Sequence, residues 1–135
     1  MFPTLKLFGV GSIPWSPLAR GLLARPLSAQ KETKRGSSDM FDRWLRFIGG
    51  YVKEGSGTPE ILKRVEELAN KKGVSMAQIA IAWILAKDGV TAPIVGTTSL
   101  DNLKDILAGV HVKLTEEEIK SLEEPYVPLP INGHA

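Results

Sequence analysis

The sequence predicts an α/β fold made of parallel strand–helix units. Two short apolar runs, Phe8–Trp15 and Val90–Val95, have the length and the Gly, Pro or β-branched composition of buried strands. Segments with apolar residues at helical spacing lie between and after them. Strands that alternate with helices indicate parallel β/α units. Two strands cannot close a sheet and would leave unpaired edges, so we expect the chain to be part of a larger fold.

The composition is that of one soluble globular domain. The chain has 135 residues, of which 43% are apolar and 24% charged, enough for one ordinary core but not comfortably for two. A net charge of +2, with acids and bases interspersed, argues against nucleic acid or an anionic membrane as a partner. The apolar runs are all shorter than the roughly 20 residues that cross a bilayer.

Cysteine and histidine usage excludes several kinds of site. The sequence has no Cys, which excludes disulfides, thiolate metal ligands and a Cys nucleophile, and fits a reducing compartment. His111 and His134 are too few for a His-based metal site. We therefore expect a cytoplasmic protein with no metal. The first residues lack the pattern of a secretory signal. The acid-poor stretch containing Lys6, Arg20 and Arg25 could be mistaken for an organellar transit peptide, but its Pro and Gly spacing argues against an amphipathic helix.

A long loop is expected between the first strand and the first long helix. Residues 23–57 are rich in Pro, Ser, Gly, Lys and Arg, and only Met40–Ile48 has a local helical pattern. A loop of this length is usually a lid, a binding loop or a disordered segment.

Three helix starts can be recognised from their caps. Thr58 is expected to cap a helix with Pro59 at its first position, and Gly73 to end it in a left-handed conformation. Ser75 and Gln78 form a capping-box pattern before the apolar helix 77–86, which is expected to be buried. A second capping box, at 115–118, opens the last helix, which should bury Ile119 and Leu122. In the helix that follows the second strand, the residues expected to face the core are Leu103, Ile106, Leu107 and Val110.

The sequence GTTSLDN, residues 96–102, follows the second strand and opens a helix. Free backbone N–H groups and the helix dipole make such a place suitable for an anion. Gly96 permits close backbone approach, and Thr97, Thr98, Ser99 and Asn102 add polar side chains. Ordinary capping of the helix by Ser99 is the alternative explanation. The segment is neither a Walker loop nor G-x-G-x-x-G.

The sequence WSPLARG, residues 15–21, occupies the equivalent place after the first strand. It carries a hydroxyl at Ser16, a cation at Arg20 and a flexible Gly21. A turn rich in Pro and Gly is the alternative. Because α/β folds bind ligands at the carboxyl ends of their strands, adjacent parallel strands would bring both loops to the same rim.

Other residues carry weaker signals. The basic stretch 33–36 could close over a phosphate, Trp83 is expected in the core, and Tyr51 and Tyr126 lack partners that would tune a pKa. No set of nucleophile, base and acid emerges, so no catalytic residue is assigned.

Taken in order, five segments resemble the C-terminal part of an aldo/keto reductase, in the branch similar to aryl-alcohol dehydrogenases and related to potassium-channel β subunits. They are IPWSPLARGLL, TKRG, RVEELANKKGVSMAQIAIAWIL, APIVGTTSLDNL and KLTEEEIKSLEEPYVPLPINGH. The resemblance implies a TIM (β/α)8 barrel. Residues 1–135 would then be a partial NADP-dependent oxidoreductase domain. Gly9–Trp15 would be strand seven and Thr91–Val95 strand eight, the first six units would be missing, and residues 23–57 would be a loop on the cofactor side.

The resemblance also implies NADP(H) as cofactor and a small carbonyl or alcohol as substrate. The loop after strand seven would hold the pyrophosphate side through Ser16, Pro17, Leu18, Arg20 and Gly21. The loop after strand eight would hold the adenosine phosphate through Gly96, Thr98, Ser99 and Asn102, with Asp105 nearby and Arg35 as a further clamp.

The resemblance leaves two matters open. Thr98 and Ser99 stand where many members have Arg or Lys, so a preference for NADPH over NADH is not established. The family's catalytic Asp, Tyr, Lys and His belong to the first four strands and match nothing in this sequence, so the chain alone is expected to be inactive. The alternatives are a non-catalytic truncated module that binds dinucleotide or regulates, like a channel β subunit, and a gene-model fragment.

Overall fold

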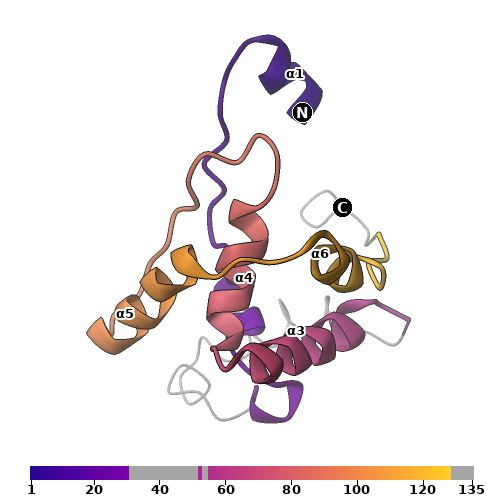
Figure 1. Ribbon diagram of the computed structural model, residues 1–135, viewed down its shortest axis with the longest axis vertical. Coiled ribbons are helices and arrows are strands. Elements are labelled where there is room, and N and C mark those ends of the chain that lie inside the picture. Colours follow the sequence, from indigo (N-terminus) through magenta and orange to yellow (C-terminus); the bar gives the residue numbers. More distant parts are fainter. Residues whose placement is uncertain (31–51, 53–54, 129–135) are drawn as a thin grey trace, which may run out of the picture.

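The computed structural model describes residues 1–30, 52 and 55–128, and its regular elements are helical (Figure 1). Helix α4 lies at the centre and contacts α3, α5 and two short 3₁₀ turns, η1 and η4. The helices are α1 (Phe2–Leu7), α3 (Thr58–Lys72), α4 (Met76–Leu85), α5 (Leu100–Ala108) and α6 (Glu116–Glu123). The 3₁₀ turns are η1 (Ala19–Ala24), η2 (Leu27–Ala29) and η4 (Gly109–His111).

The two predicted strands are present only as short extended segments that pair with each other. Two isolated parallel bridges join Ser12 to Val90 and Trp15 to Ile94, and the described residues contain no longer strand. The backbone N–H of Ser12 donates to Gly89 at 2.9 Å, and that of Thr91 donates to Ser12 at 2.8 Å. The parallel direction matches the sequence prediction, but the extent of the strands does not.

The prediction that these segments are buried is wrong for this structure. Phe8 is 72% exposed, Ile13 62% and Trp15 69%, and Ile94 is 45% exposed. Apolar composition indicates that a segment can be buried, but burial also needs a covering layer on both faces of the sheet. Within the described residues each extended segment pairs only with the other.

Helix α3 begins and ends close to its predicted limits. Its first residue is Thr58, so Pro59 occupies the second position and Gly57 is the N-cap, without a side-chain hydrogen bond. The predicted cap is therefore displaced by one residue. Gly73 ends the helix in the left-handed region, with φ 66°, as expected.

The apolar helix α4 is buried as predicted, on most of its faces. Ser75 is its N-cap and accepts a hydrogen bond from the N–H of Gln78. The side chain of Gln78 does not return to Ser75, because it donates to Asp105 on α5. Only one half of the predicted capping box is therefore made. The buried residues of α4 are Met76, Ala77, Ile79, Ala80, Ile81 and Ala82.

The last two helices differ in how well their inward faces were predicted. In α5 Ile106 is buried as predicted and Leu103 is half-buried, whereas Leu107 and, in the following η4, Val110 are about half exposed, contrary to expectation. In α6 both halves of the capping box between Thr115 and Glu118 are present, and Leu122 is buried, as predicted. The core unites Leu22 with residues of α3, α4 and α6, namely Leu62, Val65, Leu68, Ala69, Met76, Ile79 and Leu122.

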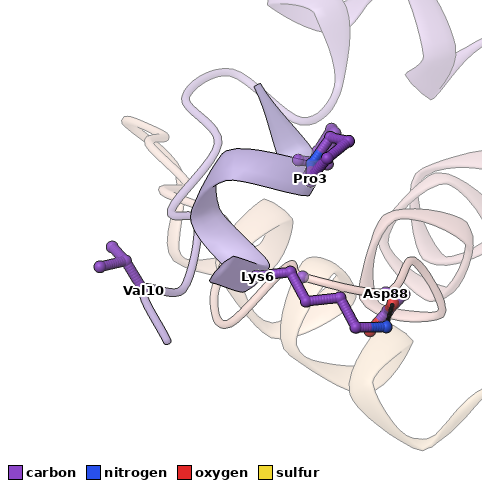
Figure 2. Close-up of a pocket in the computed structure, with 6 residues that line it drawn as sticks. Pro3, Lys6, Val10 and Asp88 are labelled. Atoms are coloured by element: carbon purple, nitrogen blue, oxygen red, sulfur yellow. Dashed lines mark hydrogen bonds and ion pairs between the residues drawn. The ribbon is translucent and has the colours of Figure 1, made fainter. Parts of the chain in front are cut away.

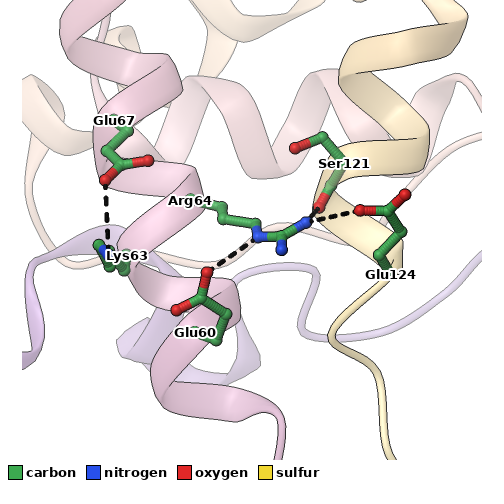
Figure 3. A network of polar contacts seen from close by, with 6 residues as sticks. All are labelled: Glu60, Lys63, Arg64, Glu67, Ser121 and Glu124. Carbon is green, nitrogen blue, oxygen red and sulfur yellow. Dashed lines mark hydrogen bonds and ion pairs between the residues drawn. The ribbon is translucent and has the colours of Figure 1, made fainter.

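Arg64 joins α3 to the end of α6 (Figure 3). Its guanidinium donates to Glu60 at 3.0 Å, to the carbonyl oxygen of Ser121 at 2.6 Å and to Glu124 at 3.0 Å. The two carboxylates raise the pKa of Arg64 from its ordinary value. This network holds the two helices that flank α4 on one side, and a shallow hollow lined by both helices lies beside it.

Several predictions fall outside the described residues. They concern Arg35, the basic stretch 33–36, the helical pattern of 40–48, Tyr51 and most of the 23–57 loop. Where the structure describes the chain, no helix has the length and apolar character needed to span a membrane.

Candidate functional site

The two loops singled out in the sequence begin side by side. The bridge between Trp15 and Ile94 pairs the last residues of the two extended segments, and Ile94 N–H donates to the carbonyl oxygen of Pro14 at 2.8 Å. Ser16 follows Trp15 directly, and Gly96 lies two residues after Ile94. Because the pairing is parallel, both loops leave the segments at the same end. This is the arrangement expected from the two motifs.

The close approach of the two segments depends on a glycine. A Cβ atom at Gly11 would collide with the Oγ1 atom of Thr91 on the neighbouring segment. Glycine at this position therefore lets the two segments approach without a shift of the Thr91 side chain or of the backbone.

The loop that follows Trp15 has an unusual backbone. Ser16 has φ 58°, Ala19 φ 49° and Arg20 φ 58°, and Gly21 follows with φ 97°. Left-handed conformations are uncommon for residues other than Gly and cost energy, so they persist only where surrounding contacts hold them. Such strain concentrates at binding sites. The Ser16 hydroxyl oxygen contributes by accepting the Arg20 N–H at 3.1 Å.

Arg20 is exposed and projects beside an aromatic ring. Its guanidinium carbon lies 5.6 Å from the centre of the Trp15 ring, within the range of a cation–π contact. Pro17 and Leu18, in the same loop, are half-buried. The cation thus lies at the surface, within six residues of the bridge to Ile94.

In the second loop, residues 96–102, some of the polar side chains form hydrogen bonds within the loop itself. Ser99 is the N-cap of α5 and accepts the Asn102 N–H at 3.4 Å, so the capping alternative is correct for this side chain. The Thr97 hydroxyl accepts the Ser99 N–H at 3.2 Å. Gly96, Thr98 and Asn102 are exposed, and nothing lies within 4 Å of where a Gly96 Cβ would be.

Asp105 does not face the candidate site. It accepts hydrogen bonds from the Ser75 hydroxyl at 2.8 Å and from the Gln78 side-chain amide at 2.6 Å. Its carboxylate joins the start of α4 to α5. The expectation that Asp105 lies near an adenosine phosphate is therefore not met, because the carboxylate is engaged by α4.

A second polar cluster joins α4 to α6. Glu123 accepts from the Trp83 indole N–H at 2.8 Å and forms an ion pair with Lys87, whose ammonium also lies over the Trp83 ring. Lys87 and Trp83 lower the pKa of Glu123, although partial burial opposes them. Trp83 is partly buried and packs against the core cluster, in line with the sequence prediction, while its indole N–H reaches this surface carboxylate. The cluster joins the end of α4 to the end of α6.

Neither of two hollows in the described part of the chain is lined by residues of the two loops. One is lined by Phe2, Pro3, Lys6, Val10, Asp88 and Gly89 (Figure 2). Lys6 crosses it to pair with Asp88 at 3.4 Å, and both side chains are largely exposed. In the same described part of the chain, no three His, Asp or Glu side chains gather as metal ligands.

One residue of the loop region had no signal in the sequence. Gln30 is only 5% exposed and donates from its amide to the carbonyl oxygens of Leu22 and Arg25, both at 2.9 Å. It lies in the stretch PLSAQKET, whose composition indicates only a loop. Its side chain bonds to backbone carbonyls of the preceding eight residues, in η1 and at its C-cap.

Comparison with known proteins identifies the family. The family model described as aldo/keto reductase matches residues 1–126. The chain belongs to the aldo/keto reductase family. As a member of this family it is related to (β/α)8 barrels, which agrees with the parallel pairing of its two extended segments.

Individual aldo/keto reductases give the same result. A Schizosaccharomyces pombe protein named "Putative aryl-alcohol dehydrogenase" is 53% identical over 133 residues, which are 98% of this chain and 35% of that protein. A versiconal hemiacetal acetate reductase of Aspergillus parasiticus is 45% identical over 98% of this chain and 37% of its own length. The chain thus spans about a third of the length of these relatives.

Proposed function

We propose that the chain forms part of the NADP(H) site of an oxidoreductase that interconverts a carbonyl group and an alcohol. Family membership and relatives named as dehydrogenases and reductases support this proposal. Those names do not favour the regulatory-module alternative. The observation that carries the proposal is the Trp15–Ile94 bridge, which starts two anion-suited loops at one place.

The proposed placement in the barrel follows from the same pairing. The segment that contains Ser12 and Trp15 would be strand seven, and the segment that contains Val90 and Ile94 would be strand eight. Parallel hydrogen bonding between them supports this assignment. The exposed apolar side chains of Phe8 and Ile13 would then face neighbouring parts of a complete barrel.

The residues of the first loop suit the pyrophosphate of a dinucleotide. Arg20 supplies an exposed cation, and guanidinium–phosphate contacts are among the stronger hydrogen bonds in proteins. Gly21 has no side chain that would block an approaching phosphate, and the left-handed turn before it, closed by internal hydrogen bonds from the N–H groups of Ala19, Arg20 and Gly21, presents the Arg20 side chain. Ser16 shapes this turn, while Pro17 and Leu18 form its half-buried base.

The residues of the second loop suit the adenosine phosphate. Gly96 is open to close approach, Thr98 and Asn102 offer exposed polar groups, and the α5 dipole favours negative charge there. Ser99 would act mainly by fixing the helix start. Arg35 is proposed as a further cation on the resemblance alone.

The preference between NADPH and NADH is proposed to be weak. No Lys or Arg occurs between Gly96 and Asn102, and Asp101 adds a carboxylate in the first turn of α5. A 2′-phosphate at this place would therefore gain no cationic side chain from this loop and would approach a like charge.

Carbonyl reduction needs a hydride and a proton, and no proton donor is assigned in this chain. When bound, NADPH supplies the hydride for a carbonyl carbon, and the protein must provide a proton to the oxygen. None of this chain's residues matches the family's proton-donating motif. The chain's part in the reaction is therefore to bind and orient the cofactor. We expect the 135-residue chain to bind dinucleotide without turnover, and we place it in the cytoplasm.

The test is an NADPH fluorescence titration of the purified chain, paired with an assay of aromatic and aliphatic aldehyde reduction. Saturable binding without reduction is the expected result. Absence of saturable binding would contradict the proposed cofactor site, and steady turnover would contradict the assignment of proton transfer to residues outside this chain.

A further inference from the structure

Gln30 is an exceptional residue in the described chain. It is the one polar residue there that is fully buried, at 5% exposed, and it lies next to the loop that carries Arg20. Uncharged amides are rarely placed so deeply unless their hydrogen bonds matter, because an unpaired polar group in the interior is costly.

The amide nitrogen of Gln30 fastens the end of that loop. Its two protons go to the carbonyl oxygens of Leu22 and Arg25, each at 2.9 Å. These two carbonyls lie at the end of η1, directly after the left-handed residues Arg20 and Gly21. Leu22 itself is 3% exposed and belongs to the core cluster. The strained turn is therefore held at its start by the Trp15 bridge and at its end by Leu22 and Gln30.

The amide oxygen of Gln30 has no such partner. It is buried and accepts no hydrogen bond from the described residues. Exchanging the oxygen and nitrogen of the amide would set an acceptor against two carbonyls, so the orientation is determined by Leu22 and Arg25. If this side chain served packing alone, an apolar side chain of the same size would stabilise the fold more, because it would leave no buried acceptor unpaired. The geometry that the amide imposes is thus the reason for its presence.

We propose that Gln30 is a positioning residue for the dinucleotide: its amide holds η1 so that the Ser16–Gly21 turn keeps the left-handed shape that presents Arg20. This inference rests on the function proposed above. Gln30 acts through the loop backbone, since the contacts described for it are with Leu22 and Arg25.

The experiment compares Gln30→Met and Gln30→Glu in the complete 135-residue chain. Met removes both donors and the unpaired acceptor at similar size, and a carboxylate keeps acceptors but cannot donate to the two carbonyls. The matched control is Leu122→Ala, which truncates a buried residue of α6 that shares the core cluster with Leu22 but lies outside the loop and makes none of the Gln30 hydrogen bonds. Each variant is measured for NADPH affinity and for its unfolding midpoint.

A spectroscopic readout separates positioning from general stability. In a Trp44→Phe/Trp83→Phe background, the emission of Trp15 reports the Arg20 guanidinium that lies over its ring. The Gln30 variants should shift this emission and weaken NADPH binding roughly tenfold, the change expected from two lost neutral hydrogen bonds. Leu122→Ala should lower the unfolding midpoint while leaving emission and affinity unchanged.

The outcomes distinguish this inference from the function on which it rests. If the unmutated chain binds NADPH and the Gln30 variants bind equally well, or if Leu122→Ala weakens binding as much, the positioning role is wrong and the cofactor site stands. If the unmutated chain does not bind, the proposed function fails. In that case the Trp15 emission still tests whether Gln30 holds the Ser16–Gly21 turn. Unchanged emission in the Gln30 variants contradicts this role, and a shift supports it.

Discussion

The backbone N–H of Ile94 donates a 2.8 Å hydrogen bond to the carbonyl oxygen of Pro14, although 80 residues separate them in sequence. This contact lies just before both candidate loops and sets their distance from each other. Helix α4 contacts both η1 and α5, the helical elements that follow the two paired segments in sequence. The candidate site therefore depends on a few backbone contacts between two short segments.

Gly11→Ala tests whether this pairing matters. The added methyl group collides with Thr91 Oγ1, so we expect the two segments to move apart at a cost of about 1–3 kcal/mol in unfolding free energy. NADPH affinity should fall with it. Urea denaturation and fluorescence titration measure the two effects. The double variant Gly11→Ala/Thr91→Ala removes the colliding oxygen and should recover most of the loss, and an unrescued double variant would contradict this explanation.

Gly96→Ala separates stability from binding. Nothing lies within 4 Å of the new methyl group, so the unfolding free energy should change by less than about 0.5 kcal/mol. A phosphate packed against this backbone would meet the methyl group, and NADPH affinity should then fall about tenfold. Thermal unfolding and titration provide the two values. Unchanged affinity would show that the cofactor does not approach Gly96.

Arg20→Ala removes the exposed cation of the first loop. Loss of a charged hydrogen bond to phosphate should weaken NADPH binding about ten- to a hundredfold. Arg25→Ala removes the same charge from the end of η1 and should change affinity less than about twofold. The difference between the two variants should shrink in 0.5 M salt because screening weakens the lost interaction. Equal effects of the two substitutions would contradict a specific role for Arg20.

The acid side of the stability profile should depend on Glu118. The Thr115 N–H, with the ammonium groups of Lys72 and Lys71, lowers the pKa of Glu118 from its ordinary value of 4.5, although burial opposes them. Since the folded-state pKa is lower than the unfolded one, this stabilisation is complete above pH 4.5 and is lost as pH falls through the folded pKa.

In the Glu118→Gln variant, the unfolding free energy should therefore fall less between neutral and acid pH than in the unmutated chain. Urea denaturation at a series of pH values measures it. Glu116→Gln changes an exposed residue in the same turn and is the control. A profile that is equally steep in both variants would show that other carboxylates, such as Glu123, determine the acid limb.

Local signals in the sequence predicted the helices well. The Thr115–Glu118 capping box, the Ser75 cap and the left-handed Gly73 each depend on residues within one turn, so a short stretch of sequence contains all the information. The apolar character of α4 likewise predicted its burial, because a helix without a polar face must be covered.

Properties that depend on distant neighbours were not predictable. Apolar composition led to the expectation that Ile13 and Trp15 are buried, but burial depends on what lies on each side of a strand. Asp105 was expected near a phosphate and instead accepts hydrogen bonds from Ser75 and Gln78, a contact between elements about 30 residues apart. Gln30 lacked any signal for a different reason: its acceptors are nearby backbone carbonyls, five and eight residues away, and every residue type has such a carbonyl.

The central claim is that one dinucleotide contacts both loops, and amide chemical-shift mapping of the ¹⁵N-labelled chain during NADPH titration tests it most directly. We predict that the amides of Ser16, of Leu18–Gly21 and of Gly96–Asn102 shift together, with one common dissociation constant. Shifts confined to one loop, or centred on the hollow between Lys6 and Asp88, would contradict the claim.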